Sequence, residues 1–168
     1  MKAKLIIDGK EIEIEISEEE CRKIQLLEEK KTGYKCVIED DAFYYVSSKG
    51  NVEIGLDMYD VDNECYESAN YYSDKTVAEN NARADKLMRQ LRRFAVEHRK
   101  CGVNLNNVNT GKYYVWYNYG SAELGVSLVF WSKVFGVIYF DSKETANAAI
   151  DEFHDELIWY FTEYKDSL

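Results

Sequence analysis

Apolar and polar residues alternate at the start of the chain and then change to a helical period. The run KLII is followed by an Asp-Gly pair and by KEIEIEI, where isoleucine alternates with glutamate. Asp-Gly accepts the positive φ angles of a tight hairpin turn, and a period of two is typical of a half-buried strand. Ser17 and Glu20 then form a capping box, and Gly33 is a favourable helix terminator. Residues 1–33 are therefore predicted to form a ββα unit.

Three short blocks further along the chain occur twice in the same order. The pairs are YYV at 44–46 and 113–115, GNVEIG at 50–55 and GSAELG at 120–125, and YYSDKTVAENNA at 71–82 and YFDSKETANAAI at 139–150. Repetition of ordered blocks indicates an internal structural repeat. We therefore predict two βββα copies, 34–100 and 112–168, joined by a loop at 101–111. The expected fold class is α+β, with antiparallel sheet packed against three helices.

The longest block of this repeat is predicted to be a strand-to-helix junction. In each copy two aromatic residues precede side chains whose oxygens can cap a helix, Ser73 or Asp74 in the first and Asp141 or Ser142 in the second. The first helix is expected over 74–100. Its apolar positions recur at helical spacing, and they are Ala78, Ala82, Leu87 or Met88, Leu91, Phe94 and Ala95. A second helix is expected to run to about residue 164.

Charge is distributed unevenly along this acidic chain. The net charge is −10, yet residues 83–100 carry seven Lys and Arg against two acids, a net +5, which leaves −15 on the rest. An acidic body is a poor general binder of nucleic acid and suits a cationic protein surface. The acids expected to form a partner-binding surface precede the basic helix: Glu39, Asp40, Asp41, Asp57, Asp60, Asp62, Glu64 and Glu67.

The basic helix supplies an alternative reading. Its cations are candidate contacts to nucleic acid, and they are Arg83, Lys86, Arg89, Arg92 and Arg93. The overall sign favours a second interpretation, in which this face pairs with the acidic 39–67 segment. The aromatic run YYVWYNY at 113–119 is either a platform for stacked bases or a central strand covered on both faces, and we favour the latter.

Neither catalytic nor metal-binding motifs occur in the sequence. No G-x-S-x-G, P-loop, G-x-G-x-x-G or H-E-x-x-H is present, and the four cysteines form no C-x-x-C pair. Asp60-x-Asp62-x-Glu64 resembles the start of a calcium loop but lacks its glycine and its final glutamate. We expect a non-enzyme with no cofactor and no metal. Without an apolar run of about 20 residues or a signal peptide, a cytoplasmic location is expected.

Several segments resemble small proteins of bacteriophages and mobile elements of Firmicutes. They are the hairpin IDGKEIEI, the junctions NYYSDKTVAENNA and VIYFDSKETANAAIDEF, and the strand YYVWYNYGSAELGV. Small acidic proteins in that setting look like inhibitors of host defence, anti-CRISPR proteins above all. The resemblance implies that the chain binds a host CRISPR effector nuclease and, through its acidic surface, blocks the cationic channel that holds target DNA. The alternatives are a nucleic-acid-binding module and a phage structural or assembly accessory, and an exposed strand edge could pair two chains as a homodimer.

Overall fold

The structure, a computed structural model, divides the chain into two compact units, residues 1–32 and 33–168. It describes residues 2–7, 10–15, 17, 33–34, 42–56 and 61–165. In the first unit, β1 (Lys2–Ile7) and β2 (Lys10–Glu15) form an antiparallel hairpin, which confirms the expectation from the Ile/Glu alternation. The helix expected after Ser17 lies outside the described residues, and so does most of the first strand of the βββα copy expected at 34–100, of which only Tyr34 is described.

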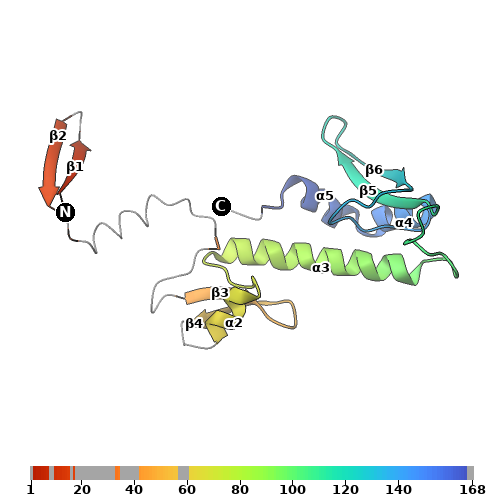
Figure 1. Ribbon diagram of the computed structural model, residues 1–168, viewed down its shortest axis with the longest axis horizontal. Coiled ribbons are helices and arrows are strands. Elements are labelled where there is room, and N and C mark those ends of the chain that lie inside the picture. Colours follow the sequence, from red (N-terminus) through yellow and green to blue (C-terminus); the bar gives the residue numbers. More distant parts are fainter. Residues whose placement is uncertain are drawn as a thin grey trace. The chain divides into compact units, whose positions relative to one another are not determined.

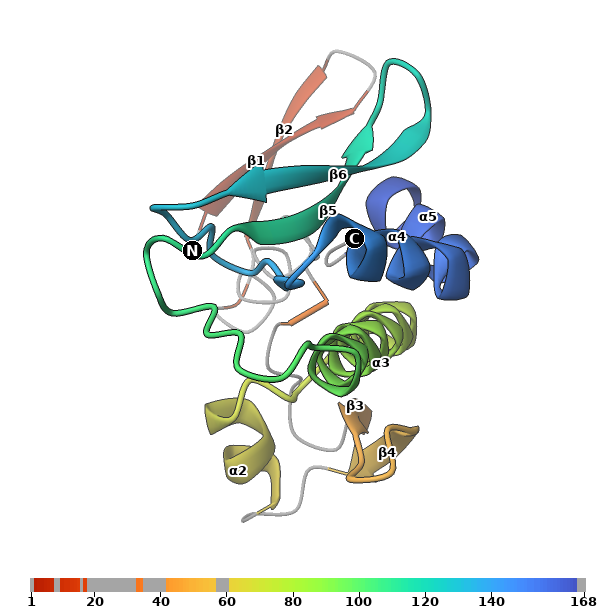
Figure 2. The ribbon, with the colours of Figure 1, turned by 90° about the vertical axis from the view of Figure 1, so that its right-hand side faces the viewer.

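The second unit is built around one long helix, α3. The described elements are β3 (Ala42–Val46), β4 (Val52–Leu56), α2 (Val61–Glu67), α3 (Lys75–Glu97), β5 (Lys112–Asn118), β6 (Glu123–Val129), α4 (Lys143–Glu152) and α5 (His154–Thr162). The hairpin β3–β4 and α2 lie on one side of α3, and the hairpin β5–β6 with α4 and α5 lies on the other (Figures 1 and 2). The fold is α+β, as predicted.

The apolar face of α3 contacts both hairpin layers. Its buried residues are Val77, Ala78, Ala82, Ala84, Leu87, Leu91, Phe94 and Ala95, which include all the predicted positions, with Leu87 rather than Met88 buried. The first turns pack with Tyr72 and β3–β4. The later turns pack with Phe140, Ala146 and Leu157 in a larger cluster that also contacts β5–β6. Burial on two sides holds α3 in place between the hairpins.

A single residue joins each helix to the hairpin before it. Tyr72 bridges Tyr44 of β3, and Phe140 bridges Tyr113 of β5, both antiparallel. Each bridge has two backbone hydrogen bonds, at 2.8 and 2.9 Å in the first and 3.0 and 2.7 Å in the second. Both aromatic residues are buried. A strand that ends in two aromatic residues was expected before each helix, and among the described residues it is a bridge of one residue.

The capping prediction is confirmed for both helices that follow these bridges. Asp74 is the N-cap of α3, and its carboxylate accepts the Val77 N–H at 3.0 Å. Ser142 is the N-cap of α4, and its hydroxyl oxygen accepts the Thr145 N–H at 3.1 Å. A side-chain oxygen at this position satisfies an N–H group that has no partner within the helix.

Two features differ from the predicted elements. The helix α2 lies in the polar stretch YDVDNECYESAN at 59–70, for which no helix was predicted. It ends in a Schellman arrangement, in which Asn70 donates to the Cys65 carbonyl while Ala69 adopts a φ of 55°. The usual glycine signal is absent there, so the sequence pattern did not reveal the helix. The final helix is divided into α4 and α5 at Phe153, which packs edge-on against Phe94 with ring centroids 5.8 Å apart.

Candidate functional site

Few of the predicted acidic residues fall in the described part of the chain. Glu39, Asp40, Asp41, Asp57 and Asp60 lie outside it, and Asp62 is placed only as a residue of α2. Glu64 and Glu67 are exposed on α2. The acidic partner-binding surface therefore stays a prediction.

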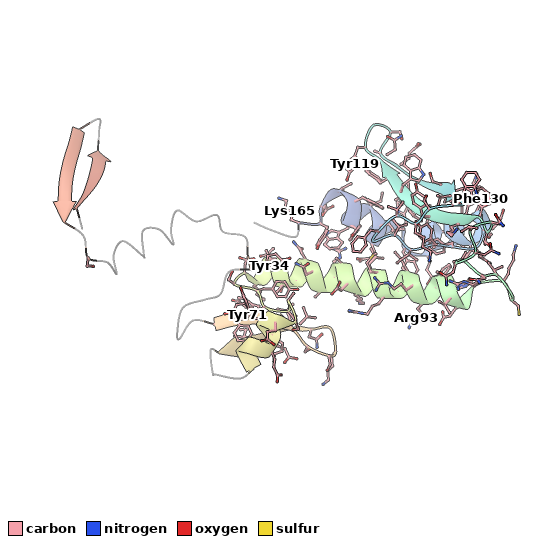
Figure 3. All side chains as sticks on the ribbon, viewed as in Figure 1. Tyr34, Tyr71, Arg93, Tyr119, Phe130 and Lys165 are labelled. Carbon is pink, nitrogen blue, oxygen red and sulfur yellow. The ribbon has the colours of Figure 1, made fainter. Side chains whose placement is uncertain are left out.

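The basic residues of α3 do not form one uniform stripe. Arg83 donates to both carboxylate oxygens of Glu156 on α5, at 2.8 and 3.1 Å, and its guanidinium lies 4.0 Å from the centroid of the Trp159 ring. The hydrogen bond to Glu156 raises the pKa of Arg83. Its observed partner is therefore α5 and not the acidic 39–67 segment, so for Arg83 the predicted pairing is wrong. The Nε of Arg93 lies 3.9 Å from the Oε1 of Glu97 in the same helix, and both side chains are exposed. Arg93 is labelled in Figure 3.

Lys86 and Arg89 line hollows in which acidic side chains are also present. A hollow of about 790 Å³ is lined by Lys75, Arg83 and Lys86 together with Glu79, Glu152 and Glu156. A second hollow, of about 670 Å³, is lined by Lys49, Lys86 and Arg89 together with Asp85. Opposite charges in the same hollow offset each other, which weakens the attraction for an anion.

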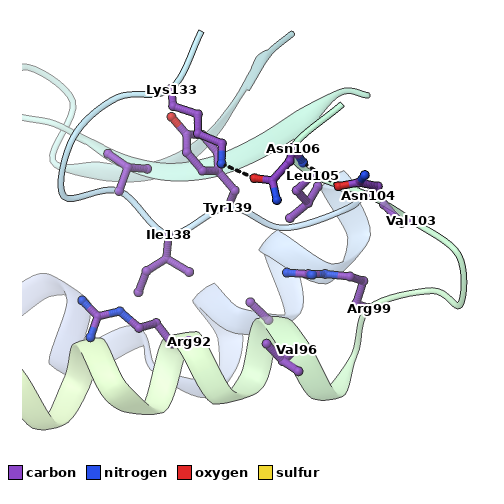
Figure 4. A pocket seen from close by; sticks show the side chains of 12 residues that line it. Arg92, Val96, Arg99, Val103, Asn104, Leu105, Asn106, Lys133, Ile138 and Tyr139 are labelled. Atoms are coloured by element: carbon purple, nitrogen blue, oxygen red, sulfur yellow. Dashed lines mark hydrogen bonds between the residues drawn. The ribbon is translucent and has the colours of Figure 1, made fainter. Parts of the chain in front are cut away.

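The end of α3 borders a pocket of different character, about 410 Å³ in volume (Figure 4). Its lining residues come from α3, from the loop after it and from the segment before Phe140: Arg92, Ala95, Val96, Arg99, Val103, Asn104, Leu105, Asn106, Lys133, Val137, Ile138 and Tyr139. Three of these are cationic, and none is Asp or Glu. We call this feature the cationic pocket.

Local structure places each of the three cations. Arg92 lies in the last turns of α3, and Arg99 follows the C-cap residue His98, whose ring stacks on Phe94 with centroids 3.9 Å apart. Lys133 comes from the opposite side and donates to the Asn106 side-chain oxygen at 2.6 Å (Figure 4). The pocket thus collects cations from segments that are distant in sequence.

Arg92 and Arg99 form no ion pair within the described part of the chain. No hydrogen bond or ion pair joins either side chain to another described residue, and the Nε of Arg99 is buried without a partner there. Asp141 does not line the pocket; its Oδ2 accepts the Lys100 backbone N–H at 2.7 Å, and its Oδ1 is buried without a hydrogen-bond partner among the described residues. Hydrogen bonds from a guanidinium to an anionic oxygen are about twice as strong as neutral ones, so the pocket is suited to an anion.

An exposed aromatic segment, residues 130–136, continues from β6 to the side of this pocket, and we call it the aromatic strap. Phe130, labelled in Figure 3, directly follows β6 and is 38% exposed. Trp131 is 83% exposed and Phe135 101% exposed. Sequence reasoning missed this strap because it considered only the tyrosines of 113–119 for stacking. The available signal was the run FWSKVFG, which is too apolar for an ordinary connecting loop.

The expectation that the 113–119 strand is a central strand is not met within the described residues. Within the described residues β5 pairs with β6, and its other edge is bridged only at Tyr113. Trp116 is exposed, and Tyr119 is 75% exposed although its hydroxyl donates to the Phe161 carbonyl at 2.8 Å. This strand is an edge strand over most of its described length.

The described residues show neither a metal site nor a membrane-spanning helix. Among the described residues no three His, Cys, Asp or Glu side chains gather closely enough to hold a metal ion. None of the described helices has both the length and the apolar character needed to cross a membrane. Comparison with known proteins finds no matching family model, no matching curated protein and no matching solved structure.

Proposed function

We propose that this protein is a binding module for nucleic acid, which it contacts through the cationic pocket at the end of α3. The observation that carries the proposal is a pocket lined by Arg92, Arg99 and Lys133 without a carboxylate, in a chain whose net charge is −10. Three like charges at one place repel one another, which destabilises the compact state. A bound phosphate removes that repulsion, so the grouping is favourable in the complex.

The number of cations in the pocket sets the expected dependence on salt. Each neutralised phosphate of a single strand contributes about −0.7 to the slope of log K against log salt, which gives about −2 for three contacts. Binding should therefore weaken about 20-fold between about 50 and about 200 mM salt. The acidic remainder of the chain lowers the absolute affinity but does not remove this dependence, since it lies outside the pocket.

The test is fluorescence anisotropy with a short labelled oligo(dT) at several salt concentrations. Arg92→Gln and Arg99→Gln should each weaken binding and reduce the slope by about 0.7. Lys75→Gln is the matched control, because it makes the same charge change on an exposed residue of the first turn of α3 that pairs with Glu79 at 3.2 Å. The proposal is wrong if the wild type does not bind at low salt, or if the pocket variants behave like Lys75→Gln.

Inhibition of a host defence nuclease is the second proposal, and the exposed Glu64 and Glu67 on α2 favour it. In this proposal the partner is a CRISPR effector in the host cytoplasm, and the acidic segment acts as a DNA mimic in its cationic channel. A DNA mimic has no reason to bind oligonucleotides itself. The same anisotropy assay therefore separates the two proposals.

We also propose that 34–100 and 112–168 are two copies of one βββα unit. The paired positions of the two bridges, at Tyr72 and Phe140, support this, as do the paired caps at Asp74 and Ser142. Ala78 and Ala146, which follow the caps at the same spacing, are both fully buried. A small residue at that position lets each helix lie close to its hairpin.

A further inference from the structure

We infer that the nucleic acid bound at the cationic pocket is single-stranded and that its bases stack on Trp131 and Phe135 of the aromatic strap. The inference rests on the proposed function and names the ligand class of the same site. Both aromatic side chains are almost entirely exposed, at 83% and 101%. The Phe130 ring lies beside that of Trp131, with centroids 6.0 Å apart, so the strap exposes more than one isolated ring. Contiguous exposed apolar surface marks an interaction site.

Some side chains of the aromatic strap line the cationic pocket, and others face solvent. Lys133 lies between Trp131 and Phe135 in sequence, and it lines the pocket and binds Asn106, whereas the two aromatic residues face solvent. Aromatic platforms beside a cationic groove are the arrangement by which proteins bind single strands, with phosphates held by charge and bases by stacking. The pocket alone offers charge, and the strap adds a surface that recognises bases.

Hydrogen bonds anchor the strap at two residues, Phe130 and Val134. The ammonium of Lys112 donates to the Phe130 carbonyl. The hydroxyl of Tyr139 accepts the Val134 N–H at 2.5 Å, and the Tyr139 ring packs edge-on against Tyr114 with centroids 6.1 Å apart. A surface that is already ordered loses little conformational entropy when a ligand binds. Trp131 and Phe135 are therefore presented for stacking without prior rearrangement of the strap.

Charge and stacking together favour a single strand over a duplex. In a duplex the bases are already stacked on each other, and one must be extruded at a cost before it reaches a protein side chain. A single strand offers its bases freely, whatever their sequence. A second copy of this chain is a weaker candidate for the strap, because the adjacent pocket cations would then face the same cations of the partner copy.

The experiment compares oligo(dT), a DNA duplex of the same length, and inorganic polyphosphate as an unlabelled competitor that carries phosphates without bases. Trp131→Ala and Phe135→Ala should each weaken oligo(dT) binding between about 5-fold and about 150-fold. The affinity for polyphosphate, derived from the competition experiment, should stay unchanged. Tyr66→Ala, which removes a 56% exposed ring from α2, is the matched control and should change neither. Thermal melting establishes that each variant is folded.

The possible failures are distinct from one another. If oligo(dT) and duplex bind equally and the strap variants have no effect, the single-strand inference is wrong while the proposed function stands. Equal losses for oligo(dT) and polyphosphate would show that the strap only supports the pocket, and would also overturn the inference. If light scattering shows that the strap variants convert a dimer to a monomer with unchanged oligonucleotide affinity, the strap is an interface between copies. If no probe binds, the proposed function itself fails.

Discussion

Lys112 offers the sharpest test of how the site is held together. Its side chain is buried, with 3% exposed, and its ammonium donates to three backbone carbonyls. The acceptors are Asn107 at 3.3 Å, Thr110 at 3.1 Å and Phe130. These bonds tie the loop that lines the cationic pocket to the first residue of the aromatic strap. Lys112→Met keeps most of the length of the unbranched side chain and removes all three hydrogen bonds.

The expected loss of stability follows from these contacts. A hydrogen bond from a charged donor contributes about 1.5–3 kcal/mol, and a buried acceptor left without a partner costs about 1–3 kcal/mol. The two longer bonds lie in a loop where water can replace part of the loss, and the variant no longer buries a charge. We therefore expect the free energy of unfolding to fall by about 3 kcal/mol, which lowers Tm by roughly 6–12 °C in a chain of this size.

Urea denaturation measures this loss directly as a shift of the midpoint at constant m value. Lys133→Met is the matched control, because this exposed lysine makes one hydrogen bond, to Asn106 at 2.6 Å. Its loss should be about 1 kcal/mol or less. If Lys112→Met has the midpoint of the wild type, or loses no more than Lys133→Met, the three carbonyl contacts do not stabilise the fold and the reasoning fails.

Two further predictions concern the junctions of the hairpins with the helices. Asp74→Ala and Ser142→Ala should each lower the free energy of unfolding by about 1 kcal/mol, whereas Ser73→Ala should not, because Asp74 is the residue that accepts the Val77 N–H; equal effects in urea denaturation would contradict the capping assignment. Burial raises the pKa of Tyr72 from 10.0 to about 12. The unfolded chain therefore ionises first as pH rises, and stability that is complete below pH 10.0 is lost towards pH 12, by at most about 2–3 kcal/mol. Tyr72→Phe should remove this part of the pH dependence, and an unchanged difference between pH 9 and pH 12 would refute it.

The predictable parts of the fold are those that depend on residues close together in the sequence. Buried positions of α3 such as Ala78, Leu87 and Phe94 recur at helical spacing, and the caps Asp74 and Ser142 stand directly before the helices. Periodicity and capping act within a few residues of each other, so each can be recognised without knowing what the element packs against.

The candidate site could not be predicted in the same way, because its contacts join residues far apart in the chain. Arg83 resembles a free cation until Glu156 is placed beside it, and Arg99 and Lys133 belong to one pocket only because the chain returns along the end of α3. The charge of a helix is readable from sequence, but which of its charges are neutralised depends on tertiary structure.

The two proposed copies differ most in one segment. It lies between the second strand of each hairpin and the residue that bridges back to the first strand, and it spans 57–71 in the first copy and 130–139 in the second. The first contains α2 and five of the eight residues of the predicted acidic surface. The second contains the aromatic strap, with Lys133 as its sole charged residue. Both proposed functions therefore depend on the same segment of the unit, with opposite charge.

In both copies this segment makes one contact with the first strand of the hairpin. The rest of the segment can therefore vary without loss of the fold. In the first copy Tyr71 stacks on the fully buried Phe43 of β3, with ring centroids 4.4 Å apart. In the second copy the corresponding strand position is Lys112, and the Phe130 carbonyl accepts its buried ammonium. In each copy one contact therefore joins the segment to the first strand of the hairpin. It is aromatic stacking in the first copy and a charge-assisted hydrogen bond in the second. Because a single residue of the segment meets this requirement, the others are free to carry different chemistry.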